Sequence, residues 1–290
     1  MSLISPGDLL ARLHDPALRI LDVRWWLTDL PKGRRDYEAA HIPGARWVDM
    51  DTVLTAPSGP GRHPLPSPAA FTDAMLALGV SDDCFVVVCD DNGGTIAARL
   101  WWMLESLGFT SVRVLDGGVP AWVAAGGPVT SEEFAFSPAP AGSLHLGAAW
   151  SRVVDRAWVA EHLGRVALVD ARAPERYRGD IEPVDRVPGH IPTAVSRPLA
   201  GNLGPSGRFL PPSELRARFA SLYGVGGADG ANAGEAVVHS CGSGINACHN
   251  LLAARVAGLP DALLYEGSYS DWTRSSMPVA VGDEPGVSPL

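Results

Sequence analysis

The strongest constraint on the fold of this chain is that its sequence repeats itself once. Asp22 and Asp170 stand in similar runs, "RILDVRWW" and "ALVDARAP", and "HIPGA" at 41–45 returns as "HIPTA" at 190–194. A third block, "FVVVCDDNGGTIAARLWWMLESLG", parallels "AVVHSCGSGINACHNLLAARVAG", and "VLDGGVPAW" parallels "LYEGSYSDW". The offsets of the four blocks are 148, 149, 150 and 150 residues. Spacing this constant indicates that one folding unit has been duplicated.

The duplication divides the 290 residues into two domains of ordinary size. We predict an N-terminal domain over residues 1–135, a linker rich in Pro, Gly and Ala over 136–150, and a C-terminal domain over 151–290. In each half, short β-branched runs alternate with helical patterns such as 96–107 and 247–256. This alternation predicts an α/β fold in which each domain is a parallel sheet with helices on both faces.

The composition excludes several classes of function. The net charge is −9 and Lys32 is the only lysine, so a nucleic-acid partner is not expected. Neither a signal peptide nor an apolar stretch of membrane-spanning length is recognisable, and we predict a cytoplasmic protein without a membrane partner. The four cysteines form neither a disulfide framework nor a CxxC metal site, so no metal is predicted and the thiols are expected to be free.

The sequence "CGSGINA", residues 241–247, matches a dinucleotide-binding fingerprint, G-x-G-x-x-A. A dinucleotide domain needs several further strand and helix units beyond this loop, and only 25 residues follow Tyr265. In the first repeat, Asp91 aligns with Cys241, so a carboxylate stands where a bound phosphate would have to approach. We therefore expect no bound nucleotide.

The same loop is well suited to a nucleophilic cysteine. Cys241 is expected directly after a strand and before a helix, at the sheet edge where ligands of α/β proteins gather. The backbone N–H groups of the loop, which includes Ile245 and Asn246, would stabilise a thiolate together with the helix dipole. Gly242 and Gly244 allow the backbone to turn tightly around the sulfur.

The alternative is that Cys241 is a small buried hydrophobe, which is a common fate of free cysteine. For Cys248, Cys84 and Cys89 we prefer that interpretation. A protein tyrosine phosphatase also carries a cysteine in such a loop, but its loop ends in an arginine, and the residue six positions after Cys241 is Ala247. With no positive side chain before His249, a phosphate dianion would lack a cationic partner.

Taken together, these motifs resemble those of the tandem-domain rhodanese-type sulfurtransferases. The loop "CGSGINAC" is similar to the "CGSGVTAC" loop of mercaptopyruvate sulfurtransferases, "GHIPTA" is similar to GHIPGA, and "YEGSYSDW" is similar to the family's C-terminal signature. The resemblance covers nearly the whole chain. It implies two rhodanese-like domains, of which the C-terminal one is catalytic and the N-terminal one is not.

The resemblance also implies a reaction. Cys241 would take a sulfur atom from 3-mercaptopyruvate or thiosulfate, become a persulfide, and pass the sulfur to cyanide or to a thiol such as that of thioredoxin. No cofactor would be needed. The alternative left open is a rhodanese-type binding or regulatory module without catalysis, and the presence of the loop cysteine favours the enzyme.

The remaining site residues are carried over from the family. Arg176 aligns with an arginine that binds the donor's anionic group, for which a forked guanidinium is suited. A second arginine of the mercaptopyruvate type is replaced by Val184, and Arg186, two residues later, is expected to substitute for it. A Ser-His-Asp relay proposed for that type matches Ser243, with His63 and Asp51 from the first half. These three residues occur in the order Asp51, His63, Ser243.

Overall fold

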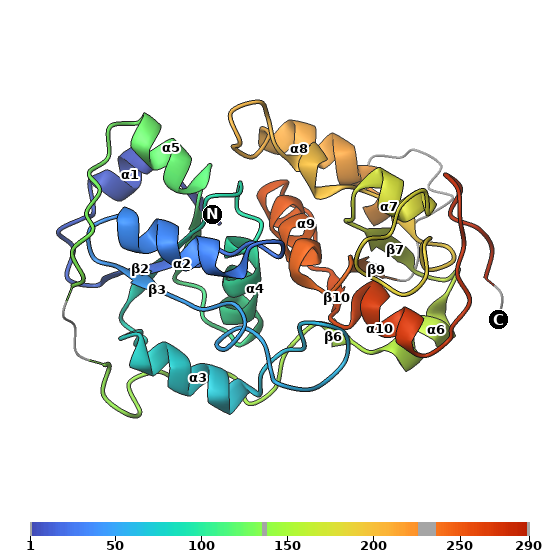
Figure 1. Ribbon diagram of the computed structural model, residues 1–290, viewed down its shortest axis with the longest axis horizontal. Helices are drawn as coiled ribbons and strands as arrows, with labels where there is room; N and C mark the ends of the chain where they lie inside the picture. The colour runs from blue at the N-terminus through green and yellow to red at the C-terminus, as the bar shows by residue number, and fades with distance from the viewer. Residues whose placement is uncertain (1, 135–137, 226–235, 289–290) are drawn as a thin grey trace. The chain divides into compact units, whose positions relative to one another are not determined.

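The computed structural model describes residues 2–134, 138–225 and 236–288. It contains two compact units (Figure 1). Unit 1 comprises residues 1–56, 66–151 and 204–209, and unit 2 comprises 57–65, 152–203 and 210–290. A short segment of the first half of the sequence, residues 57–65, therefore belongs to unit 2.

Unit 1 is built on a five-stranded parallel sheet with the strand order β1-β5-β4-β2-β3. Figure 1 shows α1 and α5 on one side of β2 and β3 and α3 on the other. The elements are β1 (Leu3–Ile4), α1 (Pro6–Leu10), β2 (Leu18–Asp22), α2 (Leu30–Ala39), β3 (Ala45–Trp47), α3 (Pro68–Ala77), β4 (Phe85–Cys89), α4 (Ala97–Ser106), β5 (Val112–Leu115) and α5 (Gly118–Ala124).

Unit 2 repeats this topology with the order β6-β10-β9-β7-β8, again all parallel. Its elements are β6 (Val153–Val154), α6 (Arg156–His162), β7 (Ala167–Asp170), α7 (Pro174–Arg178), β8 (Val195–Ser196), the 3₁₀ helix η1 (Leu199–Asn202), α8 (Pro212–Phe219), the 3₁₀ helix η2 (Ala220–Tyr223), β9 (Val237–Ser240), α9 (Ile245–Val256), β10 (Leu263–Tyr265) and α10 (Ser268–Arg274). The predicted α/β class and the parallel sheets are confirmed.

The two units also repeat individual side-chain contacts, which supports the duplication inferred from the sequence. The indole of Trp122 donates to the Pro128 carbonyl over 2.8 Å, and that of Trp272 donates to the Pro278 carbonyl over 2.7 Å. A buried Arg–Asp ion pair follows the second strand of each unit, Arg24 with Asp22 and Arg172 with Asp170. In each unit the histidine of the HIPGA-like motif stacks on a buried tyrosine.

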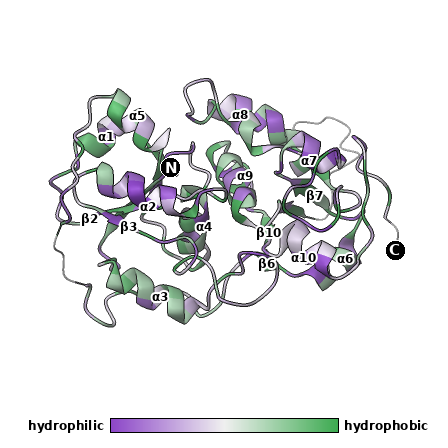
Figure 2. Ribbon diagram, in the orientation of Figure 1, coloured by the Kyte–Doolittle hydropathy of each residue, from purple (hydrophilic) through white to green (hydrophobic). Residues whose placement is uncertain are grey.

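Apolar side chains from both the strands and the helices form a separate core in each unit. In unit 2 the core includes Leu168, Val238, Tyr265 and Trp272, all at most 2 % exposed. Helices with one face on the sheet keep polar residues on the other, as α8 does with buried Leu215 and Phe219 between charged neighbours (Figure 2). This amphipathic pattern is what a helix packed on a sheet requires.

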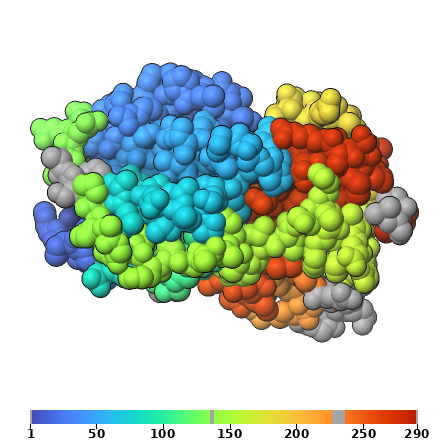
Figure 3. Space-filling view, turned by 90° about the horizontal axis from the view of Figure 1, so that it is seen from below, coloured from blue at the N-terminus to red at the C-terminus, as the bar shows by residue number. Residues whose placement is uncertain are grey.

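Part of the predicted linker lies along unit 1. Ala139 N–H donates to the Leu76 carbonyl, and the Trp150 ring packs against Phe71. Figure 3 shows this yellow-green stretch beside the cyan residues of α3. The start of the predicted linker, residues 136 and 137, lies outside the described residues. In the described part of the chain, no helix is long and apolar enough to cross a membrane.

Candidate active site at the Cys241 loop

Cys241 follows β9 directly and lies in the short loop that leads into α9. In the sheet, β9 pairs with β7, and the chain leaves β7 for β8 on its other side. The loop therefore lies at the carboxyl end of the sheet, at the point where the strand order reverses. Binding sites of open α/β sheets are found at this position.

The backbone of the loop folds around the sulfur of Cys241. The N–H groups of Ser243 and Gly244 donate to Sγ over 3.4 and 3.1 Å, and Cys241 is 2 % exposed. Gly244 has φ of 81°, a left-handed conformation that glycine adopts without a steric penalty, and it caps the N-terminus of α9. A negative charge on Sγ would face two N–H donors and the positive end of a helix dipole.

The predicted loop residues contribute to this arrangement in different ways. Ser243 and Gly244 supply the described donors to Sγ, and the absence of a side chain at Gly242 leaves room for a neighbouring guanidinium group. Ile245 and Asn246 form the first turn of α9. Cys248 lies in the same helix and donates its thiol to the Gly244 carbonyl over 3.2 Å, which fits the structural role predicted for it.

The first residues of α10 hold the loop from the other side. Ser268 Oγ accepts the Cys241 N–H over 3.1 Å, and the carbonyls of Cys241 and Gly242 accept the N–H groups of Tyr269 and Ser270 over 3.0 and 2.9 Å. Sequence reasoning did not identify Ser268 as a site residue. The signal was present in the repeated "YEGSYSDW" block, which aligns Ser268 with Gly118 of the first unit.

His63 lies beside the loop because residues 57–65 pack within unit 2. Its Nδ1 is 2.8 Å from Ser243 Oγ, and the ring is 8 % exposed. The segment is anchored by Leu65 N–H, which donates to Glu266 Oε2 over 3.0 Å, and by Arg274, which donates to the Gly61 carbonyl over 2.6 Å. The structure thus brings two of the three predicted relay residues together.

Asp51, the third predicted member of the relay, belongs to unit 1. Its carboxylate accepts the indole N–H of Trp25 over 3.0 Å. This contact explains why a carboxylate is accommodated at position 51, where it satisfies a partly buried donor. A part for Asp51 in the relay stays a prediction from the family resemblance.

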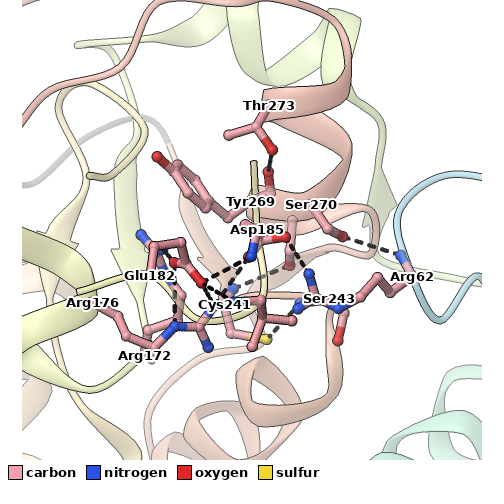
Figure 4. A network of polar contacts seen from close by, with 12 residues as sticks. Arg62, Arg172, Arg176, Glu182, Asp185, Cys241, Ser243, Tyr269, Ser270 and Thr273 are labelled. Atoms are coloured by element: carbon pink, nitrogen blue, oxygen red, sulfur yellow. Dashed lines mark hydrogen bonds and ion pairs between the residues drawn. The ribbon is translucent and has the colours of Figure 1, made fainter. Parts of the chain in front are cut away.

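Arg176 is joined to a chain of ion pairs beside the loop (Figure 4). Its guanidinium donates to Glu182 over 2.7 Å and to Asp185 over 3.0 Å. Asp185 also forms an ion pair with Arg62, and Glu182 forms one with Arg172. Burial raises the pKa of Asp185, and the nearby charge of Glu182 adds to this, although the two arginines oppose it. For Glu182, burial is outweighed by hydrogen bonds from Arg176 and the backbone, so its pKa is lowered.

Two guanidinium groups converge on Gly242, the residue after the cysteine. A Cβ at this position would lie 2.9 Å from Nη2 of Arg62 and 3.7 Å from both Nη atoms of Arg176. The predicted Arg186 is exposed instead and has no described contact with the loop. Arg62 was missed in the sequence because it lies 180 residues away from Gly242, and only its neighbour His63 belonged to a motif.

The corresponding loop of unit 1 is filled by a carboxylate. Asp90 accepts the N–H groups of Asn92 and Gly94 at Oδ1, and those of Ile96 and Ala97 at Oδ2, over 2.9 to 3.0 Å. Asp90 is completely buried. In unit 1, the backbone N–H groups of this loop therefore bind the protein's own carboxylate. In unit 2, the corresponding N–H groups surround the Cys241 sulfur.

This geometry corrects the alignment of the two loops. The sequence pairs Asp91 with Cys241, but the Asp90 carbonyl accepts from Val119 as the Cys241 carbonyl accepts from Tyr269. The sheet registers agree, because Cys89 pairs with Asp22 as Ser240 pairs with Asp170. Asp90 is thus the structural counterpart of Cys241. The error arose because unit 1 has one more residue between Asp90 and Gly108 than unit 2 has between Cys241 and Gly258.

Comparisons with known proteins agree with this architecture. Residues 5–125 and 155–275 each match the family model of the rhodanese-like domain. A protein of Pseudomonas aeruginosa named "Probable 3-mercaptopyruvate sulfurtransferase" is 44% identical over 97% of this chain and 98% of its own. Mouse thiosulfate sulfurtransferase is 37% identical over 91% of this chain and 87% of its own.

A solved structure shows the same similarity in three dimensions. The 3-mercaptopyruvate sulfurtransferase from Leishmania major superposes with a TM-score of 0.81 at 30% identity, covering 94% of this chain and 74% of that one. The chain therefore belongs to the rhodanese family, with two copies of the rhodanese-like domain. The match over nearly its whole length places it among the tandem-domain sulfurtransferases of that family.

Among the described residues, no group of three or more His, Cys, Asp or Glu side chains is placed to hold a metal ion. The Cys241 sulfur accepts from two backbone N–H groups, and two guanidinium groups lie beside Gly242; both kinds of donor are suited to anions.

Proposed function

We propose that this chain transfers a sulfur atom from 3-mercaptopyruvate or thiosulfate to a thiophilic acceptor through a persulfide on Cys241. The observation that carries the proposal is the cradle of Ser243 and Gly244 N–H groups around Sγ at the N-terminus of α9. The same donors stabilise the thiolate before transfer and the persulfide after it. Covalent catalysis of this kind divides one transfer into two easier steps.

With 3-mercaptopyruvate, the Cys241 thiolate attacks the donor's sulfur. A sulfur–sulfur bond forms, the carbon–sulfur bond breaks, and its electron pair passes to carbon as the enolate of pyruvate. One proton then converts the enolate to pyruvate, and it balances the proton that Cys241 lost. With thiosulfate, the sulfur–sulfur bond of the donor breaks and sulfite leaves with the electron pair.

The contact between His63 and Ser243 supports 3-mercaptopyruvate as the preferred donor. At 2.8 Å from Nδ1, the Ser243 hydroxyl can deliver a proton to the enolate and be reprotonated by His63. Sulfite is a stable anion that leaves without such a proton. A positioned acid therefore benefits the reaction with 3-mercaptopyruvate and is not required for thiosulfate.

Arg176 and Arg62 are proposed to bind the anionic group of the donor. Both guanidinium groups lie close to Gly242, next to the reacting sulfur. A planar guanidinium matches a carboxylate or a sulfonate with paired hydrogen bonds. In this arrangement Arg62 takes the part that the sequence had suggested for Arg186.

The second step returns Cys241 to its thiolate form. The terminal sulfur of the persulfide passes to cyanide, giving thiocyanate, or to a thiol, and a dithiol protein such as thioredoxin would release it as sulfide. We assign both steps to unit 2, because the N–H donors of the unit 1 loop are already bound to Asp90. The cytoplasmic location remains a prediction from the sequence.

The experiment is to incubate the purified protein with each donor and to measure its intact mass. One added sulfur atom on Cys241, located by peptide mapping, is expected with the wild type. The Cys241→Ser variant should gain none and should produce no thiocyanate. A mass increase on Cys248 would contradict the assignment, and no transfer with either donor would favour the alternative of a non-catalytic binding module.

A further inference from the structure

The carboxylate of Asp185 stands between the two arginines proposed to bind the donor. One oxygen pairs with Arg62 and the other accepts from Arg176 Nη2 over 3.0 Å (Figure 4). The side chain is 3 % exposed, and its own N–H donates to Glu182 Oε1 over 2.9 Å. Asp185 is therefore a fixed and buried part of the proposed anion site.

The charges of this cluster balance before any donor arrives. Three guanidinium groups face three carboxylates, in the chain Asp170, Arg172, Glu182, Arg176, Asp185 and Arg62. A donor that enters adds negative charge to a neutral, largely buried group. Each unit of added charge is repelled by Asp185 at short range, and this repulsion grows in proportion to the charge of the donor.

Donor atoms of the two arginines remain without a hydrogen-bond partner among the described residues. Nε of Arg62 is buried, and Nη2 of Arg62 and Nη1 of Arg176 lie on the side of Gly242. A single carboxylate could accept from these two Nη atoms while Asp185 keeps its own contacts. A sulfonate dianion would need more of the positive charge that Asp185 already neutralises.

We propose that Asp185 is a specificity-determining residue that favours monoanionic donors over dianionic ones. 3-Mercaptopyruvate carries one negative charge with its thiol protonated, whereas thiosulfate carries two. The residue acts by neutralising Arg62 and Arg176, and this inference rests on the sulfurtransferase function proposed above.

The test compares KM for the two donors in the wild type and in Asp185→Asn. Removing one negative charge should lower KM on the order of tenfold per unit of donor charge, so about tenfold for 3-mercaptopyruvate and about 100-fold for thiosulfate. Competitive inhibition by sulfite should strengthen more than inhibition by pyruvate. Asp185→Glu keeps the charge and should retain the wild-type ratio of KM values within about threefold.

Asp180→Asn provides the matched control. Asp180 lies in the same loop and pairs with Arg178 of α7, but it is exposed and has no described contact with the Cys241 loop. Its KM values should equal those of the wild type. If Asp185→Asn does not fold, Asp185→Ser serves as a second neutral variant, with the unfolding midpoint measured for each.

The outcomes separate this inference from the proposed function. If the wild type forms a persulfide but the neutral variants have an unchanged or higher KM for thiosulfate, Asp185 merely positions the arginines and the inference is wrong. An equal decrease for both donors would also overturn it. If the wild type accepts sulfur from neither donor, the proposed function fails and the inference fails with it.

Discussion

The imidazole of His63 lies 2.8 Å from the hydroxyl of Ser243, although 180 residues separate them in the sequence. Both belong to unit 2, because residues 57–65 pack against α10 and the Cys241 loop. The contact joins an imidazole to a hydroxyl two residues from Cys241, the proposed nucleophile. Under the proposed function, we expect this contact to distinguish the two sulfur donors.

We predict that Ser243→Ala and His63→Phe impair the reaction with 3-mercaptopyruvate selectively. Loss of a positioned acid should lower kcat/KM about 100-fold for this donor, while thiosulfate should be affected less than about threefold. Steady-state kinetics with both donors would measure this. The discharge of a preformed persulfide to a thiol is the internal control and should be unchanged. Equal losses with the two donors would show that the pair has only a structural role.

We predict that Arg176→Met weakens donor binding. A charge-assisted hydrogen bond to the donor's anionic group is lost, so KM should rise about tenfold or more for both donors with a smaller change in kcat. Arg178→Met, on the same helix but paired with exposed Asp180, should behave as the wild type. A variant with normal KM for both donors would remove Arg176 from the site.

The Asp90 carboxylate is predicted to stabilise unit 1 without taking part in chemistry. In Asp90→Asn, one oxygen is replaced by an NH₂ group that cannot accept from the backbone N–H groups of Ile96 and Ala97. The loss should lower the free energy of unfolding by about 2 to 4 kcal/mol. Urea denaturation would measure it, and kcat for sulfur transfer should remain close to that of the wild type at low temperature. A fall in kcat without a fall in stability would contradict this role.

His239 is predicted to make the protein less stable in mild acid. It is fully buried in β9, where burial lowers its pKa from 6.5 to about 3, and it contacts the hydroxyl of Tyr223. The unfolded chain therefore binds a proton between these pH values and the folded chain does not, so stability is complete above pH 6.5 and is lost as the pH falls. Protonation of His239 in the unfolded chain lowers the free energy of unfolding by roughly 2 kcal/mol at pH 5.

The measurement is the urea midpoint of the wild type and of His239→Phe at pH 7 and pH 5. The variant has no titratable group at this position. Between pH 7 and pH 5 its free energy of unfolding should therefore fall by about 2 kcal/mol less than that of the wild type. The remaining carboxylates and histidines are common to both proteins and cancel in the comparison. Identical losses would show that His239 does not carry the effect.

Local patterns in the sequence predicted the Cys241 loop well. A buried run, a glycine at the left-handed position and a helix are encoded by neighbouring residues, and the repeat showed which features differ between the two loops. The alignment still paired Asp91 with Cys241. Hydrogen bonds of the sheet decide this register, and they place Asp90 there.

The residues around the loop were harder to predict because they come from distant segments. Arg186 is close in sequence to the expected position, but Arg62 is the residue whose guanidinium lies beside Gly242. Asp185 stands in a stretch that departs from the family motif, and only the ion pairs show that it faces both Arg62 and Arg176.

By itself the sequence determined the duplication and the α/β class, and it singled out Cys241 as the candidate nucleophile, since these depend on periodicity, spacing and residue type over short ranges. Only the tertiary structure decided which charged and polar groups meet at the sulfur, including His63, Arg62 and Asp185. The reason is physical: hydrogen bonds and ion pairs act over a few ångströms in space. The distance between two residues along the chain does not reveal whether folding brings them that close.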